Sequence, residues 1–398
     1  MTVAAPVIPA LAAVIANTEA RAELLTRLVR PEVRDLPAYN AGLSSEVVRQ
    51  RYGVQHVARL ASNENPFGPS PAVALALTQL ALTVGLYPDA NCRALRAAIA
   101  ARTGAQPEQV VVGNGSENLL EVLCQAFLEP GDRVVTLLPS FGLHEIYPRM
   151  MGARVQMLPV TPALEFDVDA WCEALAQGPA PKLAMLSNPS NPVGCMLDAA
   201  AFRRIVQATP QTTLLVIDEA YYEYALHTPG FPDALAELRA QDRPWIVLRT
   251  FSKAWGLAGL RVGYGIASDD RLVQMLDRVR TPFNVNLAAQ TAALAAWNDP
   301  AYMRKCVSDT VDERKRMAAQ LRTMGLVVAP SATNFLFLNL QRPNGPVVEA
   351  LLKRGVIVKP WKEAGYEQFI RVSVGAAQDN ALFLEAFSDA MRAPIEPH

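Results

Sequence analysis

The sequence predicts an α/β protein with a large unit built on a mostly parallel, doubly wound sheet and a smaller α+β unit. Two observations favour this fold. From Val110 onward, short apolar runs of strand length alternate with amphipathic segments of helical length, which is typical of a parallel sheet with helices on both faces. Beyond a helical region that starts near Leu287, the pattern changes to strands around a single helix.

Bulk composition argues against nucleic-acid, membrane and metal chemistry. The 398 residues contain 37 Lys and Arg against 38 Asp and Glu, so no global field attracts polyanions. Five scattered cysteines without a Cys-x-x-Cys pair indicate thiols in a reducing compartment. The four histidines lack metal-ligand spacing, and we interpret each as structural or exposed. The start of the chain has no basic residue before its apolar run, so we expect a cytoplasmic protein.

The first part of the chain predicts helices and a loop. Apolar residues at helical spacing over residues 8–29 indicate an amphipathic helix. Residues 62–71 are rich in proline and predict a loop, because proline fixes φ and removes a donor. Helices are expected over residues 72–80 and 91–101, on either side of a Tyr-Pro-Asp turn at 87–89.

The alternating region begins with a strand at 110–112, a glycine turn at 113–116, a helix at 117–128 and a strand at 133–138. This layout directs the free N–H groups of a helix N-terminus toward an anion. The turn matches neither a complete dinucleotide-binding pattern nor a P-loop, so an ordinary connection remains an alternative.

Several polar residues follow the later predicted strands. We expect strands at 154–159, 183–187, 214–217, 246–248 and 263–267, and helices at 169–176 and 199–207. Ligands of such sheets bind at the carboxyl ends of the strands. Asn188, Asn191 and Asp218 occupy this position, as does the loop that carries Lys253.

Lys253 and Arg261 are the two cations of an otherwise uncharged run, residues 250–264, between two predicted core strands. Burying unpaired cations is costly, so the run indicates an anionic ligand. A phosphate suits Arg261 and the hydroxyls of Thr250 and Ser252, which leaves the Lys253 amine as a nucleophile. On these residues alone, the alternative is two surface cations with solvated ends.

The predicted α+β unit has strands at 334–340, 356–358 and 369–374 and a helix at 347–354. Arg371 alternates with Ile370 and Val372, so its side chain faces away from theirs. A solvated edge arginine and an anion-binding arginine both fit this pattern.

Three motifs together resemble the fold type I (class II) aminotransferases, which use pyridoxal 5'-phosphate (PLP). They are Asn-Pro-Ser-Asn-Pro-Val-Gly at 188–194, Asp-Glu-Ala-Tyr at 218–221, and Ser252-Lys253 with Arg261 eight residues after the lysine. Leu-Ala-Ser-Asn-Glu-Asn-Pro at 60–66, Tyr-Pro-Asp at 87–89 and Ile-Arg-Val-Ser-Val-Gly at 370–375 look most like the histidinol-phosphate aminotransferase branch. The resemblance runs from about residue 36 to the C-terminus.

The resemblance implies a fold type I PLP-dependent transferase with two domains. Residues 67–290 would form the large PLP-binding domain and residues 291–398 the small α+β domain. The N-terminal helix and arm, residues 1–66, would join the small domain.

The resemblance also implies roles around the cofactor ring. Lys253 would form a Schiff base with PLP and later move a proton. Asp218 would keep the pyridinium nitrogen protonated, although a helix cap is the structural alternative for this residue. Asn191 and Tyr221 would hydrogen-bond the ring hydroxyl oxygen. Phe141 would stack on the ring, where many relatives have tyrosine.

Further contacts implied by the resemblance hold the cofactor phosphate. They come from the side chains of Thr250, Ser252 and Arg261 and from the backbone of Ser116 and Glu117, with the Glu117 carboxylate pointing away. Tyr87 would reach the phosphate of a neighbouring subunit's cofactor, which implies a homodimer with shared sites.

On the substrate side, the resemblance assigns Arg371 to the anionic end of the substrate, a carboxylate or a phosphate. Tyr39 and Asn65 would close over the substrate from the N-terminal segment. Lys359 stands where the histidinol-phosphate branch usually has a second arginine. Lysine keeps the positive charge and loses the two-pronged geometry, which leaves the amino donor open.

We therefore predict amino transfer from L-histidinol phosphate to 2-oxoglutarate, giving imidazole acetol phosphate and L-glutamate in histidine biosynthesis. One alternative is an aminotransferase for aromatic or other L-amino acids, favoured by Lys359 and Phe141. Two others are a PLP-dependent decarboxylase of a phosphorylated amino acid and a non-enzymatic ligand-sensing domain. No basic recognition helix precedes residue 31, which argues against the last. The expected partners are small molecules and a second copy of the chain.

Overall fold

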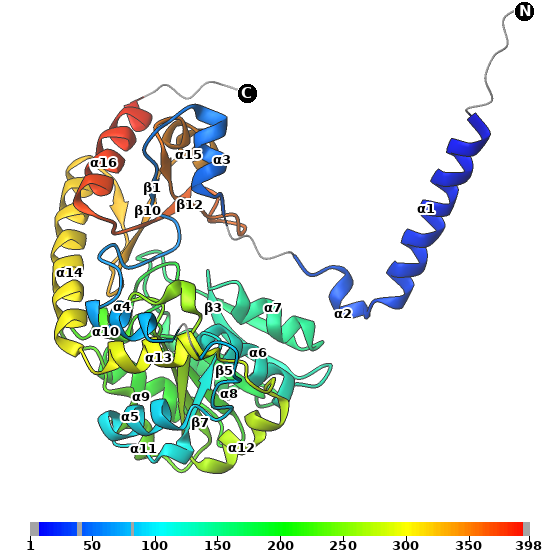
Figure 1. Ribbon diagram of the computed structural model, residues 1–398, viewed down its shortest axis with the longest axis vertical. Coiled ribbons are helices and arrows are strands. Elements are labelled where there is room, and N and C mark those ends of the chain that lie inside the picture. Colours follow the sequence, from blue (N-terminus) through cyan, green and yellow to red (C-terminus); the bar gives the residue numbers. More distant parts are fainter. Residues whose placement is uncertain (1–7, 38–41, 81–82, 393–398) are drawn as a thin grey trace, which may run out of the picture.

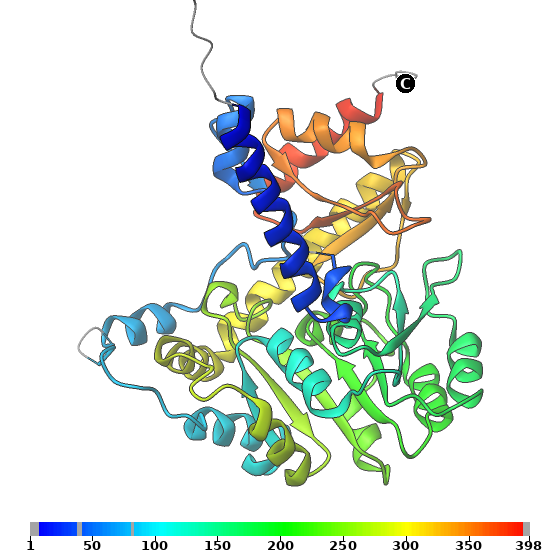
Figure 2. The same ribbon diagram turned by 90° about the vertical axis from the view of Figure 1, so that its right-hand side faces the viewer.

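The computed structural model describes residues 8–37, 42–80 and 83–392, with side chains from residue 18 onward. Figure 1 shows two units, a small one above a large one, and Figure 2 shows the same stacking from the side. Each unit has a sheet of its own. One hydrophobic core lies within the small unit, whereas the main core of the large unit also includes Phe335, Phe337 and Phe369 of the small unit. Among the described helices, none is long and apolar enough to cross a membrane.

The large unit is built on a seven-stranded sheet in the order β2-β8-β7-β6-β5-β3-β4. Neighbouring strands from β4 to β7 are parallel, and β8 is antiparallel to both of its neighbours. The predicted mostly parallel sheet is confirmed. The strands are Val110–Gly113 (β2), Arg133–Leu138 (β3), Arg154–Pro159 (β4), Leu183–Ser187 (β5), Leu214–Asp218 (β6), Trp245–Thr250 (β7) and Gly263–Ala267 (β8).

Helices cover both faces of this sheet because successive strand residues point to opposite sides. In β6, Leu215 and Ile217 join one core, whereas Leu214 and Val216 join the other. The first core includes residues of α5 (Arg93–Thr103), α8 (Val168–Ala176), α9 (Ala199–Ala208), α11 (Ala234–Arg239) and α13 (Leu287–Trp297). The second includes α6 (Ser116–Phe127), α12 (Asp270–Val279) and part of α7 (Leu143–Met150).

Several of these helices begin where an aspartate accepts hydrogen bonds from free backbone N–H groups. Asp167, Asp198 and Asp269 cap α8, α9 and α12 in this way. Short helical turns complete the large unit: α4 (Pro71–Thr78), α10 (Tyr222–Ala225) and the 3-10 turns η1 (Pro107–Gln109) and η2 (Ala258–Leu260).

The small unit has a four-stranded antiparallel sheet in the order β12-β13-β10-β9. These strands are Lys359–Pro360 (β12), Phe369–Ser373 (β13), Phe335–Asn339 (β10) and Val327–Val328 (β9). Its core also includes residues of α14 (Pro300–Thr323), α15 (Asn344–Lys353) and α16 (Ala377–Arg392). The predicted strand at 356–358 lies outside this sheet, because β11 (Val356–Ile357) pairs in parallel with β1 (Ala58–Arg59).

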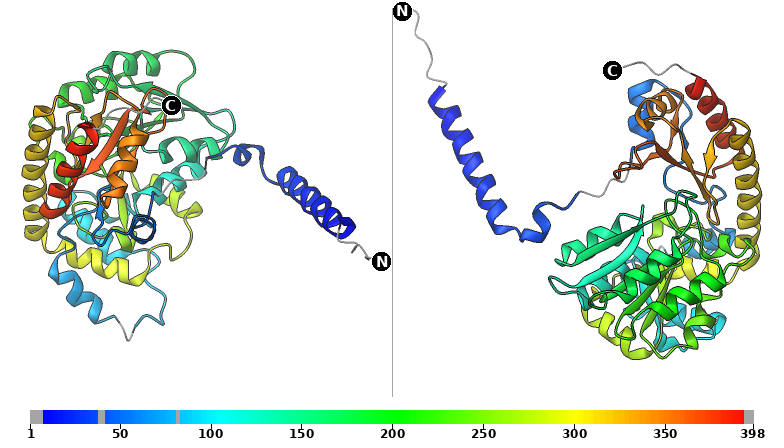
Figure 3. Two further views of the ribbon diagram at one scale, coloured as in Figure 1. Left: turned by 90° about the horizontal axis from the view of Figure 1, so that it is seen from above. Right: turned by 180° about the vertical axis from the view of Figure 1, so that it is seen from behind.

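The N-terminal segment joins the small unit through β1. It contains α1 (Ile8–Leu28), α2 (Pro31–Arg34) and α3 (Ser45–Tyr52). Figure 3 shows α1 extending away from both units. The predicted domain boundary at residue 290 falls inside α13, which packs on α4 and α5, and the domain bounds remain a prediction.

Candidate active site

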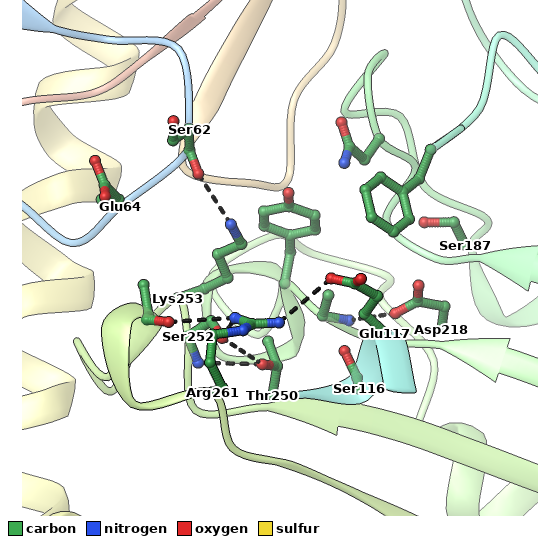
Figure 4. A pocket seen from close by; sticks show the side chains of 15 residues that line it. Ser62, Glu64, Ser116, Glu117, Ser187, Asp218, Thr250, Ser252, Lys253 and Arg261 are labelled. Carbon is green, nitrogen blue, oxygen red and sulfur yellow. Dashed lines mark hydrogen bonds and ion pairs between the residues drawn. The ribbon is translucent and has the colours of Figure 1, made fainter. Parts of the chain in front are cut away.

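Two adjoining cavities lie at the carboxyl ends of β5, β6 and β7, as expected for a doubly wound sheet. The first cavity, shown in Figure 4, has a volume of about 280 Å³, and the second has a volume of about 440 Å³. Residues that line both are Ser62, Phe141, Asn191, Tyr221 and Lys253. The first also contains Ser116, Glu117, Asp218, Thr250, Ser252 and Arg261, and the second contains Lys359 and Arg371.

Lys253 follows β7 and lies where the two cavities meet. Its Nζ donates a hydrogen bond to the carbonyl oxygen of Ser62 at 3.0 Å. Burial, and next the positive charge of Arg371, lower the pKa of Lys253 to about 8. Its amine is therefore neutral in a larger fraction of molecules near neutral pH than an ordinary lysine, which suits a nucleophile.

Asp218 is the last residue of β6, and both of its carboxylate oxygens have partners. Oδ1 accepts from the backbone N–H of Ala220 at 3.0 Å, and Oδ2 lies 3.0 Å from Nε2 of His144. Nδ1 of the same ring lies 3.1 Å from Oγ of Ser140. Since a carboxylate only accepts, Nε2 carries the proton in this pair.

His144 is a site residue that the sequence analysis missed. It is fully buried on α7, 74 residues from Asp218 in sequence, and a histidine without ligand spacing carries no local signal of such a contact. The prediction that all four histidines are structural or exposed did not anticipate this contact with a site residue. In the fold, α7 lies beside the end of β6, which brings His144 to Asp218. His144 restrains the carboxylate that the cavity presents.

Two glycines shape a cradle for an anion at the start of α6. A Cβ on Gly263 would lie 2.2 Å from the backbone nitrogen of Ser116. A Cβ on Gly115, whose φ is +81°, would lie 2.6 Å from a guanidinium nitrogen of Arg261. Glycine at both positions lets the first N–H groups of the helix approach the arginine closely, and such groups lack intrahelical partners.

Hydroxyl groups complete this cradle. Oγ of Ser252 lies 3.0 Å from Oγ1 of Thr250 and accepts from Arg261 at 3.4 Å. A helix N-terminus, two hydroxyls and a guanidinium form a donor set suited to a phosphate group.

The structure corrects the expected direction of the Glu117 side chain. Its Oε2 lies 3.3 Å from NH2 of Arg261, and its Oε1 accepts from the hydroxyl of Tyr147 at 3.1 Å. Figure 4 shows the carboxylate pointing toward the guanidinium. The attraction of the arginine and the tyrosine hydroxyl explains this orientation, which differs from the expected one facing away.

Arg371 and Lys359 form a cationic wall in the second cavity. They are direct partners across β12 and β13. Ile370 and Val372 belong to the core of the small unit, so Arg371 faces the opposite side, as predicted. It donates to Oδ1 of Asn191 at 2.6 Å and to the carbonyl oxygen of Ala61 at 2.5 Å. Burial, and next Arg371, lower the pKa of Lys359.

Asn65 does not line either cavity. Its side chain donates to the carbonyl oxygen of Ala254 at 2.9 Å and accepts from the N–H of Phe67 at 2.9 Å. The expectation that Asn65 closes over a substrate needs correction, because both polar ends of its amide hold backbone in place.

Asn63, two residues earlier, occupies the second cavity and was not predicted. Its Nδ2 donates to the hydroxyl of Tyr221 at 2.9 Å, and its Oδ1 accepts from Ser373 at 2.8 Å. Its φ of 56°, in the left-handed region that asparagine tolerates, turns the loop toward the tyrosine.

Two other predicted residues lie elsewhere. Tyr39 falls outside the described residues. Tyr87 is 83% exposed and stacks on Phe283 with ring centroids 4.7 Å apart, away from both cavities of its own chain. Among the described residues, no group of His, Cys, Asp and Glu could hold a metal ion.

Comparison with known proteins identifies the family. Residues 55–387 match the family model for aminotransferase class I and II, which is most of the chain. The chain belongs to the class I and II aminotransferase family. Its predicted fold and enzyme class are thereby confirmed.

Individual relatives of this aminotransferase cover nearly its whole length. It is 48% identical over 364 residues to histidinol-phosphate aminotransferase 3 of Rhizobium meliloti (strain 1021), covering 92% of this chain and 98% of the relative. It is 42% identical over 365 residues to histidinol-phosphate aminotransferase 2 of Caulobacter vibrioides, covering 91% and 94%. A crystal structure of histidinol-phosphate aminotransferase from Sinorhizobium meliloti in complex with pyridoxal-5'-phosphate matches with a TM-score of 0.83 at 30% identity, covering 92% and 98%.

The residues of the first cavity fit a cofactor of that kind. The cradle at α6 suits a phosphate, Phe141 lines the cavity as a flat apolar surface, and the restrained Asp218 carboxylate suits a protonated ring nitrogen. The Lys253 amine suits an aldehyde carbon. These groups converge on one cavity of this aminotransferase.

Proposed function

We propose that this aminotransferase uses PLP to transfer the amino group of L-histidinol phosphate to 2-oxoglutarate. The observation that carries the proposal is the presence of two anion-binding regions, one in each of the two cavities that Lys253 lines. The cradle at α6 serves the cofactor phosphate, and the wall of Arg371 and Lys359 serves a phosphate or carboxylate of the substrate. The high identity to histidinol-phosphate aminotransferases over nearly the whole chain supports this choice of donor.

The residues of the first cavity hold the cofactor in the proposed reaction. When bound, PLP supplies an electron-withdrawing ring that stabilises negative charge on the carbon that loses a proton. Asp218 holds the proton on the ring nitrogen, and His144 positions Asp218 through the 3.0 Å hydrogen bond. Because Oδ1 of Asn191 accepts from Arg371, its Nδ2 is left to donate to the ring oxygen beside the Tyr221 hydroxyl.

Lys253 would hold the cofactor covalently and would move the proton. Its amine would act as the general base that takes the proton from the substrate carbon next to nitrogen and as the acid that gives it back. A pKa of about 8 keeps a useful fraction of this amine unprotonated at neutral pH. Arg371 and Lys359 hold the anionic end of each substrate while this transfer occurs.

We further propose a homodimer in which Tyr87 reaches the site of the neighbouring subunit. Tyr87 and Phe283 stack at the surface, and Leu75, Val84 and Leu86 are exposed nearby in sequence. Exposed aromatic and apolar side chains of this kind are typical of protein interfaces. Five cysteines without a disulfide support a reducing location such as the cytoplasm.

A second candidate function is transamination of aromatic L-amino acids. Lys359 replaces the second arginine expected for a phosphate, and Phe141, Ile146 and Trp361 make part of the second cavity apolar. An aromatic side chain with a single carboxylate would fit such walls.

The absorbance of the cofactor-loaded enzyme distinguishes these candidates. L-Histidinol phosphate is expected to bleach the visible band, and 2-oxoglutarate is expected to restore it. The proposal fails if histidinol phosphate leaves the band unchanged while an aromatic amino acid bleaches it. A variant with Lys253→Ala serves as the control without a covalently held cofactor.

A further inference from the structure

The second cavity has an acidic side that the proposed reaction does not use. Glu145 enters it from α7 of the large unit, and Glu363 enters it from the loop after β12 of the small unit. The two carboxyl groups lie close enough that Glu145 adds to the effect of burial on Glu363. Together they raise the pKa of Glu363 to about 7.

The two glutamates differ in their partners. Glu145 forms an ion pair with Arg149 on the same helix at 2.7 Å. Oε2 of Glu363 is buried and has no hydrogen-bond partner within the described part of the chain. The same is true of the indole Nε1 of Trp361, two residues earlier, which also lines the cavity. Buried polar atoms nearly always have a partner, so a bound ligand is a natural source of one.

The charges of the cavity are unevenly distributed. Arg371 and Lys359 form the cationic wall, with Lys253 at the junction with the first cavity. Lys362 lies next to Glu363 in the loop and also lines the cavity. A substrate that is anionic at one end and carries an N–H donor at the other end matches this distribution.

We propose that Glu363 determines which amino donor the enzyme accepts. Its carboxylate accepts a hydrogen bond from the N–H group of the imidazole ring of histidinol phosphate. This assignment rests on the proposed function, in which the donor phosphate binds Arg371 and Lys359. The neutral imidazole ring has one N–H donor and one acceptor nitrogen. Glu363 accepts from the imidazole N–H, and the indole N–H of Trp361 donates to the other imidazole nitrogen.

This arrangement explains how one cavity selects a ring-bearing donor. A site whose buried polar groups require partners discriminates strongly against an analogue that lacks the matching groups. Histidinol phosphate has both an anionic end and a ring with an N–H group. Glutamate and 2-oxoglutarate have no ring and depend on the cationic wall instead.

The test compares three amino donors with the cofactor-loaded enzyme. L-Histidinol phosphate carries amine, phosphate and ring, 2-aminopropyl phosphate carries amine and phosphate without the ring, and L-glutamate is the ordinary second donor. The variants are Glu363→Ala, Glu363→Gln as the change closest in shape, and Glu367→Gln as a matched control. Glu367 is an exposed carboxylate in the same loop whose Oε2 accepts from the N–H of Gly365, and glutamine keeps that acceptor.

We expect Glu363→Ala to lower kcat/KM for histidinol phosphate by roughly 10- to 100-fold, the usual range for a lost hydrogen bond to a charged group. We expect Glu363→Gln to lower it less, because the amide oxygen still accepts. Both variants should keep kcat/KM for 2-aminopropyl phosphate and glutamate within about twofold of wild type, and Glu367→Gln should change none of the three values.

An equal loss with all three donors would show that Glu363 only supports the loop and would overturn the assignment. Unchanged kinetics with histidinol phosphate in both Glu363 variants would also overturn it while leaving the proposed function intact. A wild-type enzyme that reacts with glutamate and not with histidinol phosphate refutes the proposed function, and the assignment with it.

Discussion

Replacing His144 with leucine is expected to slow transamination, although His144 itself lies behind Asp218, the residue proposed to contact the cofactor. In the structure, the His144 ring is fully buried, and its Nε2 lies 3.0 Å from the carboxylate of Asp218. Leucine fills part of the same space and offers no donor. Oδ2 of Asp218 then loses this partner, and the carboxylate would be held less firmly against the ring nitrogen of the bound cofactor.

The magnitude follows from this one hydrogen bond. A hydrogen bond to a charged group contributes about 1.5–3 kcal/mol, and each 1.36 kcal/mol in a barrier is a factor of about ten in rate. If the loss falls on the transition state, kcat should decrease by roughly 10- to 100-fold. The free energy of unfolding should decrease by about 1–3 kcal/mol, because a buried acceptor loses its partner.

The assay pairs His144→Leu with His144→Gln. Glutamine can place an N–H donor near the position of Nε2, so His144→Gln should be more active than His144→Leu. If His144 only filled space, the glutamine variant would have no such advantage in activity. The readouts are kcat with histidinol phosphate, the visible cofactor spectrum and urea unfolding. A leucine variant that keeps kcat within about twofold of wild type would refute the positioning role of His144.

Three further predictions concern the cofactor and substrate groups. Protonation blocks attack by the Lys253 amine, whose pKa is about 8. The rate at which cofactor-free enzyme captures PLP, followed by stopped flow, should therefore increase with rising pH and level off above pH about 8. A capture rate that is independent of pH between 6 and 9 contradicts this. Gly263→Ala should weaken PLP binding by at least about tenfold, measured by equilibrium dialysis, because its Cβ would lie 2.2 Å from the Ser116 nitrogen and must displace the start of α6. Gly259→Ala, with open space around its Cβ, is the matched control. Arg371→Lys keeps the charge and loses the guanidinium that donates to Asn191 and Ala61 and that is proposed to grip the substrate with two prongs. KM should therefore rise roughly tenfold or more for both substrates, and an unchanged KM would show that charge alone suffices.

Local patterns were sufficient to predict the strands of the large sheet and most of the polar residues that line the first cavity. Hydrophobic runs, turn residues and helix caps act over a few residues, so β3, β4, β5 and β8 have the bounds that the sequence predicts. Asp218 and Lys253 could be predicted because Asp218 ends β6 and Lys253 lies in the loop after β7, and parallel strands bring their carboxyl ends to one edge.

The tertiary structure alone decided which polar atoms meet across that edge. His144 contacts Asp218, Asn63 contacts Tyr221, and Glu117 points toward Arg261, although each pair is far apart in the chain. Asn65 has the same residue type as Asn63 and lies only two positions away, yet it faces backbone instead of the second cavity. Such differences depend on a single φ angle or on the packing of one helix, which residue type and spacing do not encode.

The acidic side of the second cavity is another contact that the sequence pattern could not predict. Glu145 and Glu363 stand on different units and become neighbours only when the small unit packs against the large one. The sequence by itself therefore determined the sheet, the family and most residues of the first cavity of this protein. The substrate-facing details were decided by tertiary packing, because hydrogen bonds act over about 3 Å and depend on where distant segments come together.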